Sequence, residues 1–274
     1  MIGATFASVN QSQLENIIRK KKSYLCVGLD SRVDQLPESV GNRVQDLLEF
    51  NRQIIESTSD LAAAYKINTA FYEQYGTEGW EILQETLDII PDDCFTIADA
   101  KRGDIGNTSS MYAKAFFENM SFDSITVSPY MGSDSIKPFL DYGKTVIVLA
   151  LTSNAGSADF QHLEADGKPL YQHVLETTTT WADPDQLMFV VGATRADHLQ
   201  KIRTIIPDHF LLVPGVGKQG GSLTEVSEYG MNERCGLLVN SSRGIIFASS
   251  GEDFATAARN EALKLQKEMS GHLI

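Results

Sequence analysis

The sequence predicts a single (β/α)8 TIM barrel, an α/β fold, preceded by one extra N-terminal helix, and three observations point to this fold class. Short apolar runs of strand length recur eight times along the 274 residues. They are nearly continuous in hydrophobicity, as expected for strands of a parallel sheet covered on both faces. Helical patterns separate these runs without a Pro/Gly/Ser-rich linker, so we expect one domain over residues 1–274. The length also fits, because such a barrel occupies about 250 residues.

The expected strands are the apolar runs at residues 24–29, 63–67, 94–98, 124–127, 145–151, 187–191, 210–213 and 236–239. A helix at about 12–22 is expected to precede the barrel, which extends over about 24–270. Apolar residues at three- and four-residue spacing predict further helices at 43–57, 78–90 and 253–268. Thr108 and Asp197 are expected to begin two more, ahead of 111–119 and 199–206. A doubly wound open sheet is the structural alternative.

Composition and charge exclude several classes of function. Lys and Arg number 23 against 36 Asp and Glu, so no overall positive field would attract nucleic acid or an anionic membrane. The longest tight apolar run, 146–151, is far too short to cross a bilayer, and residues 1–22 lack the pattern of a signal peptide. Three separated cysteines without metal-ligand spacing suit reduced thiols. We therefore expect a cytoplasmic protein that could still bind a small anion where a few cations converge.

Charged and amide residues gather where the first three expected strands end: Asp30, Lys66, Asn68, Asp99, Lys101 and Asp104. The carboxyl ends of barrel strands carry the chemistry, and residues two apart on a strand face the same side. Lys66 therefore shares a side with Asn68, and Asp99 shares one with Lys101.

Charges at a barrel mouth are costly unless they compensate one another. The two lysines and the carboxylates of Asp99 and Asp104 sum to zero, which makes an alternating charge network reasonable. The D-x-K-x-x-D pattern alone would also fit a structural salt-bridge network or a solvated loop. Its position at the end of a strand, with Lys66 at the end of the preceding strand, favours a catalytic role.

A second candidate site follows the seventh and eighth expected strands. Residues 214–221 read PGVGKQGG, in which glycines let backbone N–H groups turn towards an anion. Arg243, after the eighth strand, could donate two hydrogen bonds to phosphate oxygens. Barrels commonly hold phosphate at the loops after the seventh and eighth strands. A flexible glycine turn with a surface arginine is the alternative. Ser153, after the fifth strand, could bind a polar edge of the substrate or cap a helix.

Metal binding is not expected from the histidines, since no pair has metal-ligand spacing. All five are interpreted as surface or structural residues: His162, His173, His198, His209 and His272.

Residues 99–108, DAKRGDIGNT, resemble the D-x-K-x-x-D-I-x-x-T signature of the orotidine 5'-phosphate decarboxylase family. Further segments are similar to motifs of that family and occur in the same order: 28–30, 65–68, 214–221 and 242–244. The resemblance extends from about residue 24 to 246. Residues 65–73 and 128–134, with the chain length, are similar to its second (type 2, mycobacterial-type) subfamily.

The resemblance implies decarboxylation of orotidine 5'-monophosphate to uridine 5'-monophosphate, the last step of de novo pyrimidine biosynthesis. Lys101 resembles the lysine that protonates C6 of the pyrimidine, and Asp99 the carboxylate that faces the substrate's own carboxylate. Asp104 is similar to an aspartate that reaches into the neighbouring subunit's site, with Ile105 and Thr108 beside it. A homodimer is therefore implied.

The resemblance implies substrate binding by a larger set: Asp30, Lys66, Asn68, Ile105, Thr108, Ser153, Pro214, Gln219, Gly220 and Arg243. In the family, the residues similar to Asp30 and Lys66 hold ribose hydroxyls and support the charge network. The residue similar to Ser153 lies at the pyrimidine edge, and those similar to Gln219, Gly220 and Arg243 hold the phosphate. Residues 241–242 and 152–154 depart from the usual family residues, so their contacts can differ in detail.

The chemistry agrees with this set of residues. Decarboxylation of a pyrimidine without an electron sink leaves a poorly stabilised carbanion at C6. An ammonium between carboxylates is favoured in its charged form, so Lys101 can offset the developing charge and donate a proton. Binding energy from the distant phosphate would order the reacting end of the substrate. No metal, pyridoxal phosphate or thiamine is implied.

Three alternatives remain open from the sequence. A Mg-dependent relative on the same barrel, such as 3-hexulose-6-phosphate synthase, also carries a D-x-K-x-x-D motif. A Schiff-base aldolase would need a neutral lysine at position 66 or 101, which the flanking carboxylates oppose. A non-catalytic nucleotide-binding barrel would bind the nucleotide without turnover.

Overall fold

The structure is a computed structural model that describes residues 9–192, 196–216 and 221–273. Its central feature is a closed barrel with the strand order β1-β10-β9-β8-β5-β4-β3-β2, in which every neighbouring pair is parallel. The strands are β1 (Leu25–Gly28), β2 (Ala64–Asn68), β3 (Phe95–Arg102), β4 (Ser124–Val127), β5 (Thr145–Leu151), β8 (Leu187–Val191), β9 (Phe210–Pro214) and β10 (Leu237–Ser241). The predicted barrel is confirmed, and the open-sheet alternative is wrong because β1 pairs with β10.

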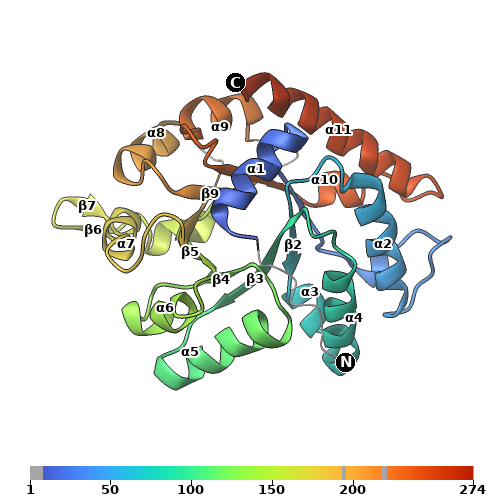
Figure 1. Ribbon diagram of the computed structural model, residues 1–274, viewed down its shortest axis with the longest axis horizontal. Coiled ribbons are helices and arrows are strands. Elements are labelled where there is room, and N and C mark those ends of the chain that lie inside the picture. The colour runs from blue at the N-terminus through green and yellow to red at the C-terminus, as the bar shows by residue number, and fades with distance from the viewer. Residues whose placement is uncertain (1–8, 193–195, 217–220, 274) are drawn as a thin grey trace.

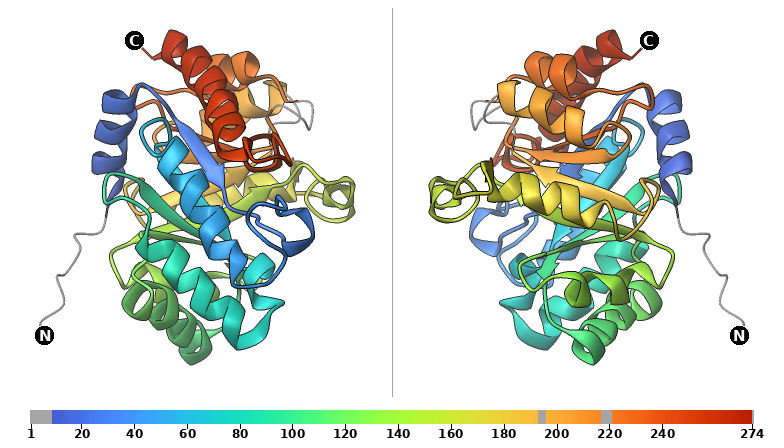
Figure 2. Two further views of the ribbon diagram at one scale, coloured as in Figure 1. Left: turned by 90° about the vertical axis from the view of Figure 1, so that its right-hand side faces the viewer. Right: turned by 90° about the vertical axis from the view of Figure 1, so that its left-hand side faces the viewer.

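Helices surround the barrel, as Figure 1 and the two side views of Figure 2 show. The helices are α1 (Gln11–Lys21), α2 (Asp46–Thr58), α3 (Ala70–Glu73), α4 (Gly76–Asp88), α5 (Gly106–Ala113), α6 (Ser133–Leu140), α7 (Leu170–Thr178), α8 (Ala196–Ile205), α9 (Leu223–Gly230), α10 (Arg243–Ile246) and α11 (Phe254–His272). Short 3-10 helices cover Val33–Gln35 and Ala155–Asp159. Across the described parts of the chain, every helix is too short or too polar to traverse a lipid bilayer.

Helix α1 packs at the amino-terminal ends of the strands and closes that end of the barrel. Asn10 caps the helix in a reciprocal pair of hydrogen bonds with Gln13, and Lys22 ends it in the left-handed conformation. The Gln11 side chain donates to the carbonyl of Leu187, the first residue of β8, at 3.2 Å. The apolar face of α1 is fully buried at Leu14. The extra helix expected at 12–22 is therefore present, one residue earlier.

The helices expected at 43–57, 78–90 and 253–268 are present as α2, α4 and α11, with ends shifted by one to four residues. The helix expected to begin at Thr108 starts at Gly106, and residues Lys114–Asn119 continue it as a π-helix. The Ser109 hydroxyl donates to the carbonyl of Asp104, which ties the first turn of α5 to the chain that enters it.

An insertion between β5 and α7 forms a small antiparallel hairpin, β6 (Glu164–Ala165) with β7 (Lys168–Pro169), which projects from the barrel in Figure 2. Its turn residues Asp166 and Gly167 both have positive φ, the geometry of the tight hairpin turn that Asp-Gly favours. The hairpin was not predicted, because its strands are exposed and too short to show alternation.

Candidate active site

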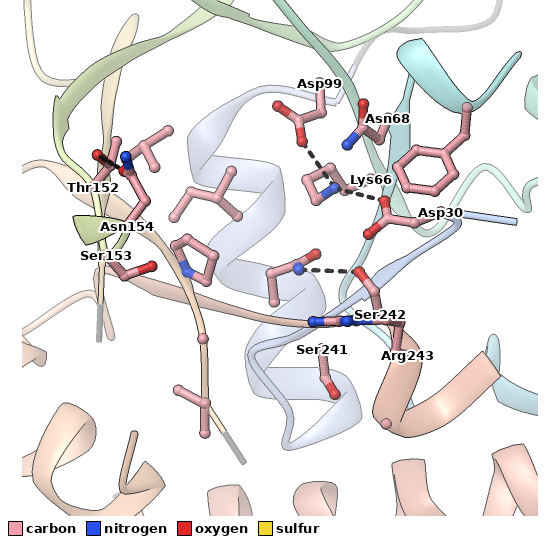
Figure 3. Close-up of a pocket in the computed structure, with 18 of the residues that line it drawn as sticks. Asp30, Lys66, Asn68, Asp99, Thr152, Ser153, Asn154, Ser241, Ser242 and Arg243 are labelled. Atoms are coloured by element: carbon pink, nitrogen blue, oxygen red, sulfur yellow. Dashed lines mark hydrogen bonds and ion pairs between the residues drawn. The ribbon is translucent and has the colours of Figure 1, made fainter. Parts of the chain in front are cut away.

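A cavity of about 870 Å³ opens at the carboxyl ends of the barrel strands. Its lining includes many of the residues expected from the sequence: Asp30, Lys66, Asn68, Asp99, Lys101, Ser153, Pro214 and Arg243. Figure 3 shows Asp30, which follows β1, with Lys66 of β2 and Asp99 of β3 on one side of this cavity, whereas Ser153 and Arg243 lie on other sides. The topology explains the convergence, since all eight parallel strands end at this mouth.

Four alternating charges form a continuous chain on one wall of the cavity. The Lys66 ammonium lies 3.2 Å from Asp30 Oδ1 and 2.9 Å from Asp99 Oδ2. The other Asp99 oxygen, Oδ1, lies 2.5 Å from the Lys101 ammonium. Within the described chain, the second carboxylate of the network is therefore Asp30 rather than Asp104.

Burial and charge act in opposite directions on the two central groups. Burial favours neutral Asp99, but the ammonium groups of Lys66 and Lys101 outweigh it and hold the pKa of the Asp99 carboxyl well below its usual value. Burial likewise favours neutral Lys66, yet Asp99 and Asp30 raise the pKa of its ammonium above the ordinary value. Both groups are charged near pH 7, so the wall of the cavity is a fixed set of ions.

Lys66 and Lys101 differ in how far they reach towards solvent. The Lys66 side chain is 6% exposed, whereas that of Lys101 is 47% exposed at the cavity mouth. Lys101 therefore extends further towards a bound molecule, while Lys66, which also lines the cavity, is held between its two carboxylates.

The backbone that carries Lys101 is irregular. Strands β3 and β4 shift register between Ala98 and Arg102, and Lys101 has a φ of 48°, in the left-handed region. The Thr126 hydroxyl, from β4, contacts both the backbone N–H of Lys101 and the Asp99 carboxylate. Thr126 was missed from the sequence, because a threonine within an apolar strand carries no sign of its partner.

The opposite side of the cavity holds Arg243, the first residue of α10. Ser242, beside it, accepts a hydrogen bond from Asn240 at 3.3 Å. Ser242 and Asn240 pack over Gly28, where a Cβ atom would lie 1.9 Å from Ser242 Oγ, so any larger residue would displace the Ser242 side chain. Gln219 and Gly220, expected to complete the phosphate site, lie outside the described residues.

Ser153 lies on a short loop after β5 that Gln161 supports. The Gln161 side chain accepts from the backbone N–H of Thr152 at 2.8 Å and donates to its hydroxyl at 2.9 Å. The Thr152 hydroxyl in turn donates to Asn154 at 2.5 Å. These three bonds fix the loop on both sides of Ser153, which leaves its hydroxyl at the cavity lining.

Asp104, Ile105 and Thr108 are absent from the cavity lining of the described chain. Asp104 is partly buried and its carboxylate accepts from the N–H of Ile105 at 2.8 Å. Ile105 is 54% exposed, and three large apolar side chains are exposed on the adjoining β4–α6 loop and on α5: Met111, Tyr130 and Met131. We call the apolar surface formed by Ile105, Met111, Tyr130 and Met131 the β3–β4 rim. Like the cavity, it lies near the carboxyl end of β3.

Several lining residues were not expected from the sequence: Arg32, Gln35, Phe71 and Asn240. Arg32 and Gln35 belong to the loop after β1 and Phe71 to α3, and only the folded barrel brings them to the mouth. Asn240 could have been predicted as a lining residue, because it is polar and directly follows the eighth expected strand. Within the described residues, His, Cys, Asp and Glu do not gather in threes that could hold a metal ion.

Comparison with known proteins gives a consistent result. Residues 23–258 match the model of the family described as "Orotidine 5'-phosphate decarboxylase / HUMPS family". A protein named orotidine 5'-phosphate decarboxylase from Flavobacterium johnsoniae is 58% identical over 94% of this chain and 96% of its own length. One of the same name from Bacteroides fragilis is 53% identical over 96% of this chain and 97% of its own length.

Solved structures agree with these relatives. The OMP decarboxylase of Leishmania donovani has a TM-score of 0.81 and 37% identity, covering 94% of this chain and 99% of its own. The UMP synthase of the same organism has a TM-score of 0.82 and 38% identity, covering 93% of this chain and 56% of its own. The barrel, the order of its motifs and these relatives together show that the chain belongs to the orotidine 5'-phosphate decarboxylase family.

Proposed function

We propose that this chain catalyses the decarboxylation of orotidine 5'-monophosphate to uridine 5'-monophosphate and carbon dioxide. The observation that carries the proposal is the row of alternating charges Asp30–Lys66–Asp99–Lys101 at the cavity mouth. The names of the similar proteins, which are called orotidine 5'-phosphate decarboxylase, support it. An ammonium that is exposed to the cavity and anchored by a carboxylate supplies both a positive charge and a proton.

In the proposed reaction, the bond between C6 and the substrate carboxylate breaks, and its electron pair stays on C6. The Lys101 ammonium stabilises this pair and then transfers one proton to C6, leaving a neutral amine that regains a proton from solvent. Asp99 holds the Lys101 ammonium at 2.5 Å and presents a fixed negative charge where the substrate carboxylate would lie. Lys66 keeps Asp99 ionised, because it bonds the other carboxylate oxygen at 2.9 Å.

Substrate binding is proposed to span the cavity. Asp30 and Lys66 would hold the ribose hydroxyls, with Asn68 beside them at the end of β2. Ser153 would bind the pyrimidine edge from the loop that Gln161 fixes. Arg243 would bind the phosphate, next to Pro214 at the end of β9, together with Gln219 and Gly220.

A homodimer is proposed as the active unit. Exposed Ile105, Met111, Tyr130 and Met131 make the β3–β4 rim apolar, and burial of such a surface stabilises association. The same rim carries Asp104 and Thr108 outside this chain's own cavity. Packing of two rims against each other would bring these residues towards the partner's cavity.

Two finer assignments are also proposed. Membership of the second, mycobacterial-type subfamily is supported by the similarity of residues 65–73 and 128–134 to that group. A cytoplasmic location is supported by three buried free thiols, which suit a reducing compartment. We further propose that the described barrel and its extra helix form a single domain.

The proposal is tested by the loss of orotidine 5'-monophosphate absorbance with purified protein in excess EDTA. Turnover under these conditions supports a decarboxylase that uses no dissociable divalent metal. Inactivity with EDTA but reaction with a sugar phosphate after Mg²⁺ is added would show instead the Mg-dependent relative. Tight nucleotide binding without either reaction would show a non-catalytic barrel.

A further inference from the structure

Thr126, a fully buried residue of β4, links the two groups at the centre of the proposed reaction. We propose that Thr126 is a positioning residue, whose hydroxyl fixes the Lys101 ammonium and the Asp99 carboxylate relative to each other. This inference rests on the proposed decarboxylase function. It assigns Thr126 no contact with the substrate.

The hydrogen bonds of Thr126 have only one consistent direction. The backbone N–H of Lys101 donates to Thr126 Oγ1 at 2.9 Å, and an amide N–H can only donate. The single hydroxyl hydrogen is therefore free for Asp99 Oδ1, which lies 3.0 Å away and can only accept while it is ionised. Because Asp99 Oδ1 also accepts from the Lys101 ammonium at 2.5 Å, a closed ring of hydrogen bonds joins the backbone and the side-chain end of Lys101.

The local backbone depends on this ring. Between the paired positions Ala98↔Ile125 and Arg102↔Val127, β3 contains more residues than β4, and Lys101 lies in this excess segment. Its left-handed conformation is strained for a residue other than glycine. The Thr126 hydroxyl accepts from the part-buried Lys101 N–H at this position and so pairs a donor that the irregular ladder leaves without its usual partner.

Thr126 is well suited to fix a geometry. Its side chain is branched at Cβ and fully buried, which restricts rotation about χ1. Asp99, which is 8% exposed, receives hydrogen bonds at both oxygens, from Lys66 on one and from Lys101 and Thr126 on the other. The Lys101 side chain is half exposed, so its place at the cavity mouth depends on Asp99 and, through it, on Thr126.

Two matched pairs of proteins isolate the effect of the Thr126 hydroxyl: wild type with Thr126→Val, and Thr126→Ser with Thr126→Ala. Thr126→Val has nearly the shape of the wild-type side chain without the hydroxyl, and Thr126→Ala differs from Thr126→Ser only by that group. In each pair, we expect the protein without the hydroxyl to have a kcat lower by about 10- to 100-fold, as for loss of a hydrogen bond to a charged group. The Kd for uridine 5'-monophosphate should change by less than about threefold, because the ligand contacts are intact.

Thermal unfolding of all four proteins separates positioning from a loss of folding. The proposal is overturned if Thr126→Val and Thr126→Ala keep kcat within about threefold of their hydroxyl-bearing partners. It is also overturned if Thr126→Ser loses as much kcat as Thr126→Ala, since the effect would then follow the methyl group. If Thr126→Val does not fold, the Ser and Ala pair still gives the answer.

Amide hydrogen exchange at Lys101 tests the ring independently of catalysis. We expect slow exchange of the Lys101 N–H in the wild-type protein and in Thr126→Ser, and exchange at least about tenfold faster in Thr126→Val and Thr126→Ala. Unchanged exchange would contradict the ring. If the wild-type protein does not decarboxylate its substrate, the proposed function fails, and a positive exchange result would leave Thr126 as a structural support with no positioning role in that reaction.

Discussion

Lys66 and Lys101 both bond Asp99, yet their surroundings give them different tasks. Lys66 is enclosed between two carboxylates, and loss of its proton would remove one ammonium partner from each of Asp30 and Asp99. Lys101 bonds one carboxylate and extends to the cavity mouth, so it can approach a bound pyrimidine. The enclosed lysine maintains the charge balance, and the exposed one is available for proton transfer.

Lys101→Ala is therefore expected to reduce decarboxylation by at least about 10³-fold, because both the local positive charge and the proton donor are lost. Binding of uridine 5'-monophosphate should remain measurable, since the phosphate and pyrimidine sides are unchanged. Steady-state kinetics and calorimetry provide the two measurements. Lys20→Ala, which removes an exposed lysine of α1, is the matched control, and near-normal turnover by Lys101→Ala would remove Lys101 from its role.

Arg243→Ala is expected to weaken the binding of uridine 5'-monophosphate by about 10- to 100-fold, the effect of losing a charge-assisted hydrogen bond. The nucleoside uridine lacks the phosphate, so its affinity should change by less than about threefold. Competition binding with both ligands measures the difference. Equal weakening of the two would place Arg243 outside the phosphate site.

His209 provides a pH-dependent contribution to stability at the amino-terminal end of β9. Burial lowers the pKa of its imidazole to about 4, and the nearby positive charge of Arg203 acts in the same direction. The folded state thus binds protons less readily than the unfolded chain, whose histidine has a pKa near 6.5. This contribution is full above about pH 6.5 and is lost as the pH falls towards 4.

Urea unfolding at pH 7, 6, 5 and 4 tests this linkage. Wild-type protein should lose more unfolding free energy over this range than His209→Leu, which cannot titrate at that position. Carboxylates contribute to both curves, so the difference between the two proteins is the relevant quantity. Parallel curves would show that His209 is not buried as a neutral group.

At the scale of elements, the end of β3 is connected to the helices around it through Arg102. Its guanidinium pairs with Glu73 of α3 and donates to the carbonyl of Ala100 at 3.1 Å. It also lies 5.3 Å from the ring centroid of Tyr112, on α5. A single side chain thus joins the strand that carries Lys101 to the helices on either side.

Arg102→Met keeps the apolar stem and removes the charged head, so it should lower the unfolding free energy by about 1–3 kcal/mol. Arg52→Met removes a more exposed pair with Glu49 on α2 and should cost less than about 0.5 kcal/mol. Chemical denaturation of both variants makes the comparison. A similar small cost for the two would show that the Arg102 contacts contribute little.

The sequence predicted elements well where a continuous apolar run decides the structure. All eight barrel strands were expected, because each is an apolar run buried on both faces. The β6–β7 hairpin was missed because its strands are very short. Its Asp166-Gly167 dipeptide is nevertheless a local signal for a tight hairpin turn. The π-helix at Lys114–Asn119 could not be expected, since apolar spacing in the sequence does not distinguish a short π-helix from a turn of α-helix.

The site was predictable only in part, for a related reason. Asp30, Lys66, Asp99 and Lys101 were expected because charges at strand ends are conspicuous between apolar runs. Thr126 has its partners on the neighbouring strand β3, and only strand pairing brings them together.

For the whole molecule, the position of Asp104 outside its own chain's cavity leads to a test of assembly. If the proposed dimer shares its sites, a mixture of Asp104→Ala and Lys101→Ala chains contains mixed dimers in which one site has both residues and the other has neither. If subunits exchange freely, half of the dimers are mixed, and about 25% of wild-type activity per chain should return. Activity is measured on each variant alone and after mixing, and no recovery despite demonstrated exchange would contradict shared sites.

The pairing of β1 with β10 has a consequence for how the protein reaches its active form. This pairing closes the barrel by joining strands near opposite ends of the chain, and the cavity lies across that junction, with Asp30 on one side and Arg243 on the other. A growing polypeptide on the ribosome therefore holds Asp30 long before Arg243 has been synthesised. Contacts between such distant segments form late and slowly in folding. Nucleotide affinity should thus emerge only after β10 and Arg243 have been synthesised and the barrel has closed, so ligand binding reports on barrel closure.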